Sequence, residues 1–298
     1  MKALVTGATG FLGRALVARL QAPRVLSRDP ARAKAGLGGV EAFPWDAERA
    51  PPPSEAVEGV DSVFHLAGDP VAEGRWSEEK KARIRDSRVK GTRNLVEAIR
   101  AAKARPKVLV GASAVGIYGD CGDQELTEAS PQGTDFLAGV CAEWEAEERG
   151  AAALGVRVVH LRIGVVLGKG GGALAKMLFP FRMGVGGTLG SGRQWMPWVH
   201  AEDVVGLALF AAENAAVSGP MNAVAPGAAT NRDFTKALGR VLHRPTLFPV
   251  PKFALKAAFG EFADILFASQ RVLPRAALDA GYRFRHPEVE GALRDVLG

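Results

Sequence analysis

The residues that point most directly to chemistry lie at the start of the chain, where glycines are spaced to bind a phosphate. Gly7, Gly10 and Gly13 occur in the run TGATGFLG at 6–13, directly after a short apolar segment. In such a run the first glycine permits a tight turn, the second lets a pyrophosphate approach the backbone, and the third lets a helix pack against the sheet. The helix then offers free N–H groups to an anion. The run predicts a dinucleotide site, and a glycine turn without a ligand is the alternative.

The end of the second expected strand decides between NAD(H) and NADP(H). An NAD site usually carries Asp or Glu there, which binds the ribose 2′-hydroxyl. This chain has Ser27 and Arg28, with Arg32 about one turn later. A guanidinium pairs with a 2′-phosphate through its planar fork, so NADP(H) is the expected cofactor. The neighbouring Asp29 complicates this assignment, and its alternative role is to cap a helix over Pro30–Ala35.

These residues need a scaffold, and short apolar segments alternate with helical patterns through the first half of the chain. Strands are expected at 2–5, 24–26, 62–66, 107–111 and 156–161, and helices at 11–20, 79–102 and 143–154. This alternation predicts an α/β fold, a doubly wound parallel sheet of the Rossmann type covered by helices on both faces.

At about 100–200 residues per domain, a length of 298 residues predicts two domains or one large domain with an appendage, and two are expected because the pattern loosens after Gly168. An NADP-binding Rossmann domain is expected over 1–167, with 198–218 returning to it. A smaller C-terminal α/β substrate domain is expected over 168–298. Within it, Lys252–Phe267 is expected to form one helix.

Further runs occur in an order typical of one known family. They are His65-Leu66-Ala67-Gly68, Val89-Lys90-Gly91-Thr92, Tyr118-Gly119 and Trp198–Asp203. Together with the glycine run they span residues 6–203 and resemble the extended short-chain dehydrogenase/reductase family. The resemblance implies an NAD(P)-binding Rossmann domain, a smaller substrate domain, and epimerisation, dehydration or reduction, often of sugar nucleotides. The expected cofactor contacts are Gly7, Thr9, Gly10, Phe11, Leu12, Gly13, Ser27, Arg28, Arg32, Leu66, Ala67, Gly68 and Arg88.

The catalytic positions of that family are changed in this chain. The family uses a Tyr with a Lys four residues later, which lowers the pKa of the Tyr so that its phenolate acts as a base. No Tyr-x-x-x-Lys run occurs here. Aligning the helix expected at Phe136–Glu145 with the family pattern puts Leu137 at the Tyr position and Cys141 at the Lys position. Arg88 replaces the usual Asn.

These departures resemble an atypical, epimerase-like group of the NAD-dependent epimerase/dehydratase superfamily. The group is similar to this chain at Leu66–Pro70, Gly74–Trp76, Arg85–Val89 and Ser269–Pro274. The resemblance implies a family-specific tail at about 247–295. The biochemical function of the group is largely undefined, so the resemblance does not identify a reaction.

Four side chains are candidates for the chemistry, namely Ser113, Tyr118, Cys141 and Arg88. Ser113 ends the fifth strand and would face a ligand, although Ala114 occupies the family's Ser position unless the loop shifts by one residue. Arg88 stays protonated and can bind a phosphate, a carboxylate or the carboxamide side of the cofactor pocket, or form a buried salt bridge. Cys141 is a small apolar residue unless Arg88 lowers its thiol pKa. Tyr118 is either a proton donor or packing beside its turn.

Aromatic residues are candidates for a substrate pocket. Trp76, Trp195 and Trp198 can stack on a flat or ring-shaped substrate or belong to the core, and Tyr118 and Glu73 can face the same ligand. Gly170–Gly172 lacks the Gly-Lys-Ser/Thr ending of a phosphate loop and is expected to be a mobile lid. Asp203 is expected to cap the helix that follows it. No metal site is expected.

Composition narrows the partners. Lys and Arg number 38 against 32 Asp and Glu, and the net charge of +6 is spread along the chain, which argues against nucleic acid. Two cysteines favour a reducing compartment. No signal-peptide core and no apolar run of about 20 residues occurs, so a cytoplasmic protein without a membrane partner is expected. It is expected to be a monomer, or a homodimer paired through the helices at 79–102 and 136–154.

Two functions remain open at this point. The first is an NADP(H)-dependent oxidoreductase or epimerase-like enzyme with an unusual active site, acting on an unknown small molecule. The second is a non-catalytic NADP(H)-binding protein that senses redox state. The intact dinucleotide motif favours both, and the replaced Tyr–Lys pair favours the second.

Overall fold

The computed structural model describes residues 1–298, except for the side chains of Lys176 and Ala258. Its centre is a seven-stranded sheet in which every pair of neighbouring strands is parallel. The order of the strands is β11 (Gly219–Ala223), β7 (Arg157–Ile163), β5 (Val108–Ala114), β4 (Ser62–His65), β1 (Ala3–Thr6), β2 (Arg24–Ser27) and β3 (Glu41–Pro44). The chain moves outward from β1 to β3 and then returns to β4 on the other side of β1, so the predicted doubly wound α/β fold is confirmed.

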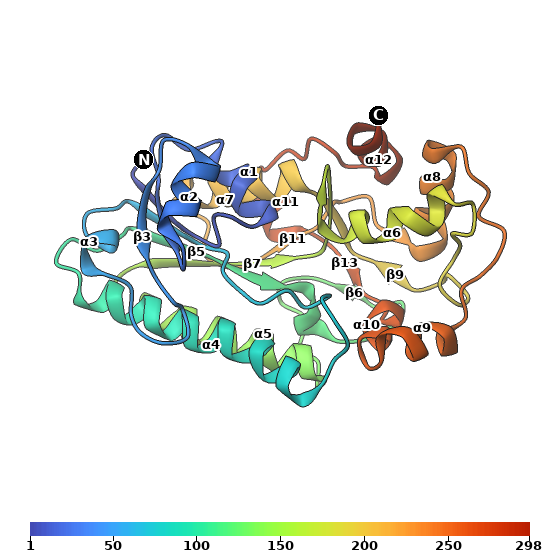
Figure 1. Cartoon of the computed structure of the whole chain (residues 1–298), viewed down its shortest axis with the longest axis horizontal. Helices are drawn as coiled ribbons and strands as arrows, with labels where there is room; N and C mark the ends of the chain where they lie inside the picture. The colour runs from blue at the N-terminus through green and yellow to red at the C-terminus, as the bar shows by residue number, and fades with distance from the viewer.

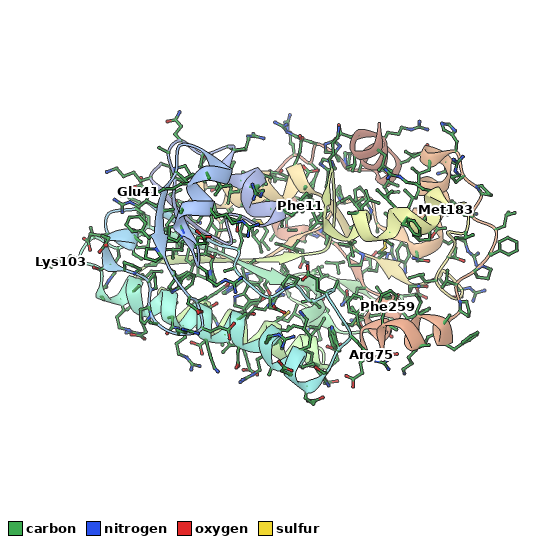
Figure 2. The ribbon with its side chains drawn as sticks, viewed as in Figure 1. Phe11, Glu41, Arg75, Lys103, Met183 and Phe259 are labelled. Carbon is green, nitrogen blue, oxygen red and sulfur yellow. The ribbon has the colours of Figure 1, made fainter. Side chains whose placement is uncertain are left out.

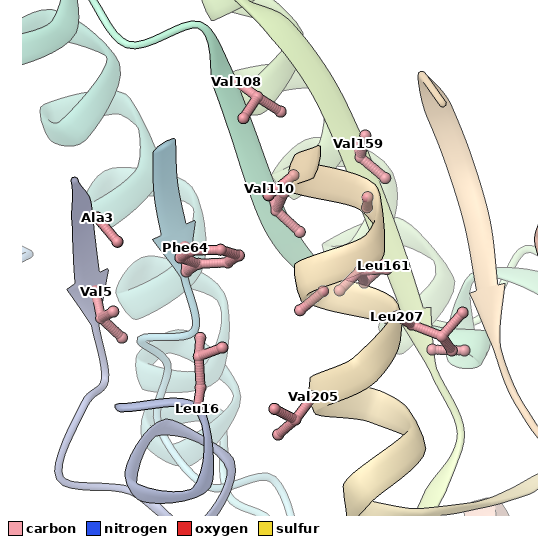
Figure 3. Packing of buried hydrophobic residues seen from close by; sticks show 14 of the residues in the cluster. Ala3, Val5, Leu16, Phe64, Val108, Val110, Val159, Leu161, Val205 and Leu207 are labelled. Atoms are coloured by element: carbon pink, nitrogen blue, oxygen red, sulfur yellow. The ribbon is translucent and has the colours of Figure 1, made fainter. Parts of the chain in front are cut away.

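Helices cover both faces of this sheet (Figure 1). One face carries α4 (Glu78–Ala101) and α5 (Phe136–Ala152), and the other carries α1 (Phe11–Val17), α2 (Pro30–Leu37) and α7 (Ala201–Glu213). Figure 3 shows apolar side chains of the strands, among them Val5, Phe64 and Leu161, meeting side chains of α1 and α7 such as Leu16 and Leu207. Both faces of the sheet are therefore buried beneath helices, which explains why the sequences of the strands are continuous apolar runs.

The other elements lie beyond the carboxyl ends of the main strands, in the right half of Figure 1. Their strands pair two by two: β8 (Val165–Gly168) with β10 (Trp198–His200), β9 (Trp195–Met196) with β12 (Ala229–Thr230), and β6 (Glu125–Leu126) with β13 (Arg271–Val272). Their helices are α6 (Gly172–Arg182), α8 (Asn231–Leu242), α9 (Lys252–Phe259), α10 (Phe262–Phe267) and α12 (Val289–Leu297). The short elements α3 (Ser54–Val57), η1 (Val115–Tyr118) and α11 (Arg275–Asp279) belong to the larger half.

The single helix predicted over Lys252–Phe267 is wrong. It breaks into α9 and α10 at Gly260, which has a φ of +64° that a helix does not allow. The helix expected over 136–154 forms as α5 and begins at Phe136, because Asp135 accepts a hydrogen bond from the Ala138 N–H and caps it. Among the helices described, none combines the length and the apolar composition that a membrane crossing needs.

Candidate functional site

The glycine run forms the turn that its spacing predicts. Gly7 has a φ of +65°, and a Cβ placed there would lie 2.6 Å from the carbonyl oxygen of Leu66. A Cβ at Gly13 would overlap the carbonyl oxygen of Gly7. Gly10 is the N-cap of α1 and has no side chain to occupy the first N–H groups of the helix. The turn therefore presents bare backbone, which suits an approaching pyrophosphate.

A buried hydrogen-bond chain holds this turn against the neighbouring strand. Thr6 Oγ1 accepts the N–H groups of Leu66 and Ala67, both at 3.1 Å, and lies 2.7 Å from His65 Nδ1. Because Thr6 Oγ1 already accepts two bonds, its own hydrogen goes to Nδ1, which leaves the hydrogen of the neutral imidazole on Nε2. Nε2 then donates to Thr92 Oγ1 at 2.9 Å. The chain of bonds fixes the position of the Gly7 turn beside Leu66–Gly68.

The buried imidazole of His65 is expected to destabilise the fold in acid. Burial, assisted by the charge of Arg88, lowers the pKa of His65 from 6.5 to about 4. Between these pH values the unfolded chain takes up a proton that the folded chain refuses. The free energy of unfolding should therefore fall by about 3 kcal/mol as the pH drops through this window. Urea unfolding at several pH values measures the slope.

The matched variants are His65→Gln and His243→Gln, since His243 is exposed. The first should flatten the slope between pH 6.5 and 4, and the second should leave it as in the wild type. Equal slopes in the wild type and in His65→Gln would contradict the assignment.

At the end of β2, the carboxylate of Asp29, the neighbour of Arg28, forms a hydrogen bond to the backbone. Asp29 Oδ1 accepts the Arg32 N–H at 2.9 Å and caps α2, and Ser27 Oγ closes the turn by hydrogen bonds to the backbone of Asp29. Arg28 and Arg32 are exposed, and neither forms an ion pair with the described residues. Thr6 pairs with Leu26, so both arginines follow a strand end adjacent to the glycine turn.

Arg88 lies against the loop that follows β4. Its Nη1 donates to the carbonyl oxygens of Asp69 and Ile84, both at 3.0 Å, and its Cζ lies 5.1 Å from the centroid of the Trp144 ring. A Cβ on Gly68 would come within 3.1 Å of the guanidinium. The carboxylate of Asp69 pairs with Lys80 instead. Burial lowers the pKa of Arg88, yet an arginine stays charged at neutral pH, so the loop keeps a cation beside Gly68.

The two positions that replace the family's Tyr and Lys are apolar. Leu137 and Cys141 lie one turn apart on α5, and Leu137 packs beside Gly116 of η1. Of the two interpretations of Cys141, the small apolar residue fits and the thiolate does not, because burial outweighs the charge of Arg88 and raises the pKa of the thiol to about 12. At neutral pH Cys141 is therefore a protonated, apolar side chain, and it supplies no base.

Ser113 and Tyr118 belong to one buried network that sequence reasoning missed. Ser113 Oγ donates to Glu145 Oε1 at 2.7 Å. Arg162 binds both oxygens of Glu145, at 2.8 and 3.0 Å, and donates to the Tyr118 hydroxyl at 3.0 Å. That hydroxyl donates in turn to Asn222 Oδ1 at 2.7 Å. The network joins β5, α5, β7 and β11, so it positions Ser113 and leaves the Tyr118 hydroxyl with two partners inside the protein.

Two features of this network bear on chemistry. β5 and β7 pair residue for residue up to Ala114 and Ile163, so Ser113 lies within a regular strand, and the one-residue shift of the following loop stays a prediction. Burial tends to raise the pKa of Glu145, but the hydrogen bonds and charge of Arg162 hold it below its ordinary value. Glu145 is therefore an ionised, weak base that orients Ser113.

A second buried acid–base pair lies beside the pair of Glu145 and Arg162. The spacing of the four charged residues in the sequence is a signal for such buried pairs. Glu148 contacts His160 Nδ1, and burial raises the pKa of Glu148 to about 7. Glu145 and Glu148 are three residues apart on α5, and His160 and Arg162 alternate on β7. Charged residues at helical spacing before a strand that carries charges at spacing two indicate buried pairs.

The three candidate tryptophans have different surroundings. Trp76 stacks edge-on against Phe136 at 5.4 Å between ring centroids and lies 5.9 Å from the ring of Phe262. Trp195 lies beneath Arg271 and donates to Asp123. Trp198 is 1% exposed and donates to the carbonyl of Gly227. A substrate-facing role for Trp198 is therefore wrong, because this ring belongs to the core of the C-terminal part. Glu73 is exposed in the loop after β4.

The loop at Gly170–Gly172, which is predicted to be a lid, packs closely against the glycine turn, and its mobility stays a prediction. A Cβ at Gly168 or Gly171 would overlap the ring of Phe11, and one at Gly172 would lie 3.3 Å from it. Phe11 is the first residue of α1, in the glycine turn itself. The glycines therefore let the loop before α6 rest on the cofactor turn.

Asp203 does not cap α7 as predicted. His200 does so, since its Nδ1 accepts the Glu202 N–H, while Asp203 accepts the N–H groups of Arg285 and His286 and holds the C-terminal tail. Ligand atoms of His200, Glu202 and His286 lie within 4.8 Å of one another. The bond to Nδ1 keeps a hydrogen on His200 Nε2, and the two imidazoles stack at 3.8 Å, so the cluster anchors the tail and is poorly arranged for a metal.

Comparisons with known proteins cover the whole chain. A sequence profile described as the NAD dependent epimerase/dehydratase family matches residues 3–224, and a domain of unknown function, DUF1731, matches 250–296. The chain is 43% identical over 311 residues to the chloroplastic epimerase family protein SDR39U1 homolog of Arabidopsis thaliana, covering 100% of this chain and 87% of that protein. It is 39% identical over 302 residues to the epimerase family protein YfhF of Bacillus subtilis, with coverages of 100% and 98%. A crystal structure of the human epimerase family protein SDR39U1 with NADPH matches with a TM-score of 0.89 at 35% identity, over 99% of both chains.

Proposed function

The chain belongs to the NAD dependent epimerase/dehydratase family, and from this premise we propose that it binds NADP(H) at the carboxyl ends of its main strands. The observation that carries this proposal is the pair of exposed arginines at the end of β2. Arg28 and Arg32 have no carboxylate partner among the described residues, and the adjacent Asp29 is occupied as a helix cap. The human relative, crystallised with NADPH, supports the same cofactor.

The residues present fit this cofactor. The bare backbone at Gly7–Gly13 would hold the pyrophosphate, and Ser27, Arg28 and Arg32 would hold the 2′-phosphate. Leu66–Gly68 follow β4, and Arg88 lies against this loop. These residues would contact the nicotinamide half of the cofactor. A bound NADP(H) would supply hydride transfer, and the protein must orient the substrate and exclude competing water.

We propose an oxidoreductase in which Ser113 orients the substrate. Because Ser113 Oγ gives its hydrogen to Glu145, its lone pairs remain to accept a hydrogen bond from a substrate hydroxyl. Glu145 is a weak base and Cys141 stays protonated, so the proton that accompanies the hydride is exchanged with water. The substrate is a small molecule of unknown identity.

A second function is favoured by one specific observation. Leu137 and a protonated Cys141 occupy the two positions at which the family keeps its base, and the Tyr118 hydroxyl bonds to Arg162 and Asn222. Such a site suits a non-catalytic protein that binds NADP(H) and reports its redox state. This function requires that NADPH and NADP⁺ bind with unequal affinities. A ligand that binds two conformations of a protein equally well does not shift the equilibrium between them.

One experiment separates these functions. We expect the wild type, incubated with NADPH deuterated at C4 and a panel of small carbonyl compounds that also carry a hydroxyl group, to transfer deuterium to a product seen by mass spectrometry. Ser113→Ala should reduce that transfer by about tenfold or more while keeping NADPH affinity. Transfer by Ser113→Ala at the wild-type rate would remove Ser113 from the reaction.

The opposite result defines the alternative. No transfer to any compound, together with protease susceptibility that differs between the NADPH and NADP⁺ complexes, would favour the redox sensor. Calorimetric titration of both cofactor pairs is the control, because absent binding would contradict both functions.

A further inference from the structure

Two segments of the C-terminal part contain basic residues and no acidic ones. Of the 38 Lys and Arg in the chain, nine lie in 169–201 and 234–260, whereas none of the 32 Asp and Glu does. The rest of the chain therefore carries a small net negative charge. The expectation that the net charge of +6 is spread along the chain is therefore wrong, because the excess of positive charge lies in these two segments.

The two segments come together in space. Val250 donates to the Thr188 carbonyl at 2.7 Å, and Gly190 donates to the Val250 carbonyl at 2.9 Å. The Arg244 side chain donates to the carbonyl of Arg182 at 3.1 Å. Figure 1 shows α6, α9 and the connection from α8 to α9 at the end of the molecule opposite β3 and α2. The positive segments thus form one end of the protein.

Large apolar side chains project from this same end. Six of them are between 63% and 78% exposed, and we call them the apolar tip: Phe179, Met183, Val185, Leu247, Phe248 and Phe253. Figure 2 shows Met183 at the outer end of α6. Monomeric proteins rarely gather large apolar side chains in this way without a partner for them.

Cations surround the apolar tip, and several lack a carboxylate. Arg182, Lys236 and Arg244 form no ion pair with the described residues. Three others share two carboxylates of neighbouring elements: Glu290 pairs with Arg240 at 2.6 Å, and Asp264 pairs with both Lys252 and Lys256, at 2.8 and 3.3 Å. The apolar tip therefore has a rim that remains positive.

We propose that the apolar tip docks onto the surface of a bilayer that contains anionic lipids. Projecting rings and aliphatic chains enter the boundary between headgroups and acyl chains, and the surrounding cations meet the anionic headgroups. A rigid protein partner would need a pocket for each projecting side chain, whereas a fluid interface needs none. The expectation that the chain has no membrane partner rested on the lack of a spanning segment, which does not bear on docking at the surface.

Flotation of the full chain with lipid vesicles tests this docking. The wild type is expected to float with vesicles of phosphatidylcholine mixed with phosphatidylglycerol, to float weakly with phosphatidylcholine alone, and to be released by salt. The double variant Phe248→Ser/Phe253→Ser should lower the partition coefficient by about tenfold or more, because it removes two inserted rings. Arg182→Glu/Lys236→Glu should lose the preference for phosphatidylglycerol.

Leu278→Ser is the matched control, since Leu278 is 44% exposed on α11, away from the apolar tip. It should float like the wild type. Absence of flotation with phosphatidylglycerol vesicles, or equal losses in Leu278→Ser and the double variant, would overturn the proposal. So would a wild-type dimer in sedimentation velocity that the double variant converts to a monomer without any vesicle binding, because a second copy would then cover the apolar tip.

Discussion

Arg28→Ala is expected to weaken NADPH binding about thirtyfold and to leave NADH binding nearly unchanged. A guanidinium bound to a phosphate in two places contributes about 2 kcal/mol, and Arg28 is exposed, so a larger effect is not expected. In this variant Asp29 stays occupied as the cap of α2, and Arg32 remains as a second exposed cation after β2. Calorimetric titration of both cofactors into both proteins measures the ratio.

The specificity of this effect depends on a matched arginine. Arg283 is also exposed and lies far along the chain in the C-terminal tail, so Arg283→Ala should bind NADPH like the wild type. An equal loss of NADPH and NADH affinity in Arg28→Ala would mean that Arg28 shapes the site and does not select the phosphate. Tighter binding of NADH than NADPH by the wild type would contradict the cofactor itself.

Arg162→Met is expected to lower the free energy of unfolding by about 3–5 kcal/mol, the largest stability effect we predict. The substitution leaves the buried carboxyl group of Glu145 without its two bonds from Arg162, so that it stays charged without a partner or must take up a proton. It also removes the donor to the Tyr118 hydroxyl and to the carbonyl oxygen of Glu128. Urea unfolding followed by circular dichroism measures the change.

A more exposed ion pair that also involves α5 provides the comparison. Arg93 pairs with Glu147 near the surface of α4 and α5, and Arg93→Met should cost at most about 1 kcal/mol. The double variant Arg162→Met/Glu145→Leu should recover much of the loss, since it removes both buried charges. If Arg162→Met lowered the free energy of unfolding no more than Arg93→Met, Glu145 would have another partner, and the proposed network would be contradicted.

Local signals made the first half of the fold predictable. The glycines at 7, 10 and 13 and the apolar run before them specify strand, turn and helix within ten residues, and Asp29 caps α2 as expected. The C-terminal part carries few such signals. β6 and β13 contain two residues each, and Glu125 pairs with Arg271 across the chain, so their pairing has no local signature.

In the candidate site, the residues required by backbone conformation could be predicted from the sequence. The protonation states that depend on burial could not. Gly7 and Gly13 follow from steric need. The state of Cys141 does not, because proximity to Arg88 and burial act in opposite directions on its pKa, and only the packing of α5 shows that burial is larger. The domain boundaries, the oligomeric state and the cytoplasmic location stay predictions.

The ring of Phe11 against Gly168 and Gly171 has a consequence for how sequences of this fold can vary. A side chain larger than hydrogen at either glycine would occupy the space of that ring, although more than 150 positions separate them along the chain. Substitutions at position 11 and at positions 168 and 171 are therefore expected to occur together. A homologue with alanine or serine at position 171 should carry a residue smaller than phenylalanine at position 11, and grafting either segment alone between homologues should fail where grafting both succeeds.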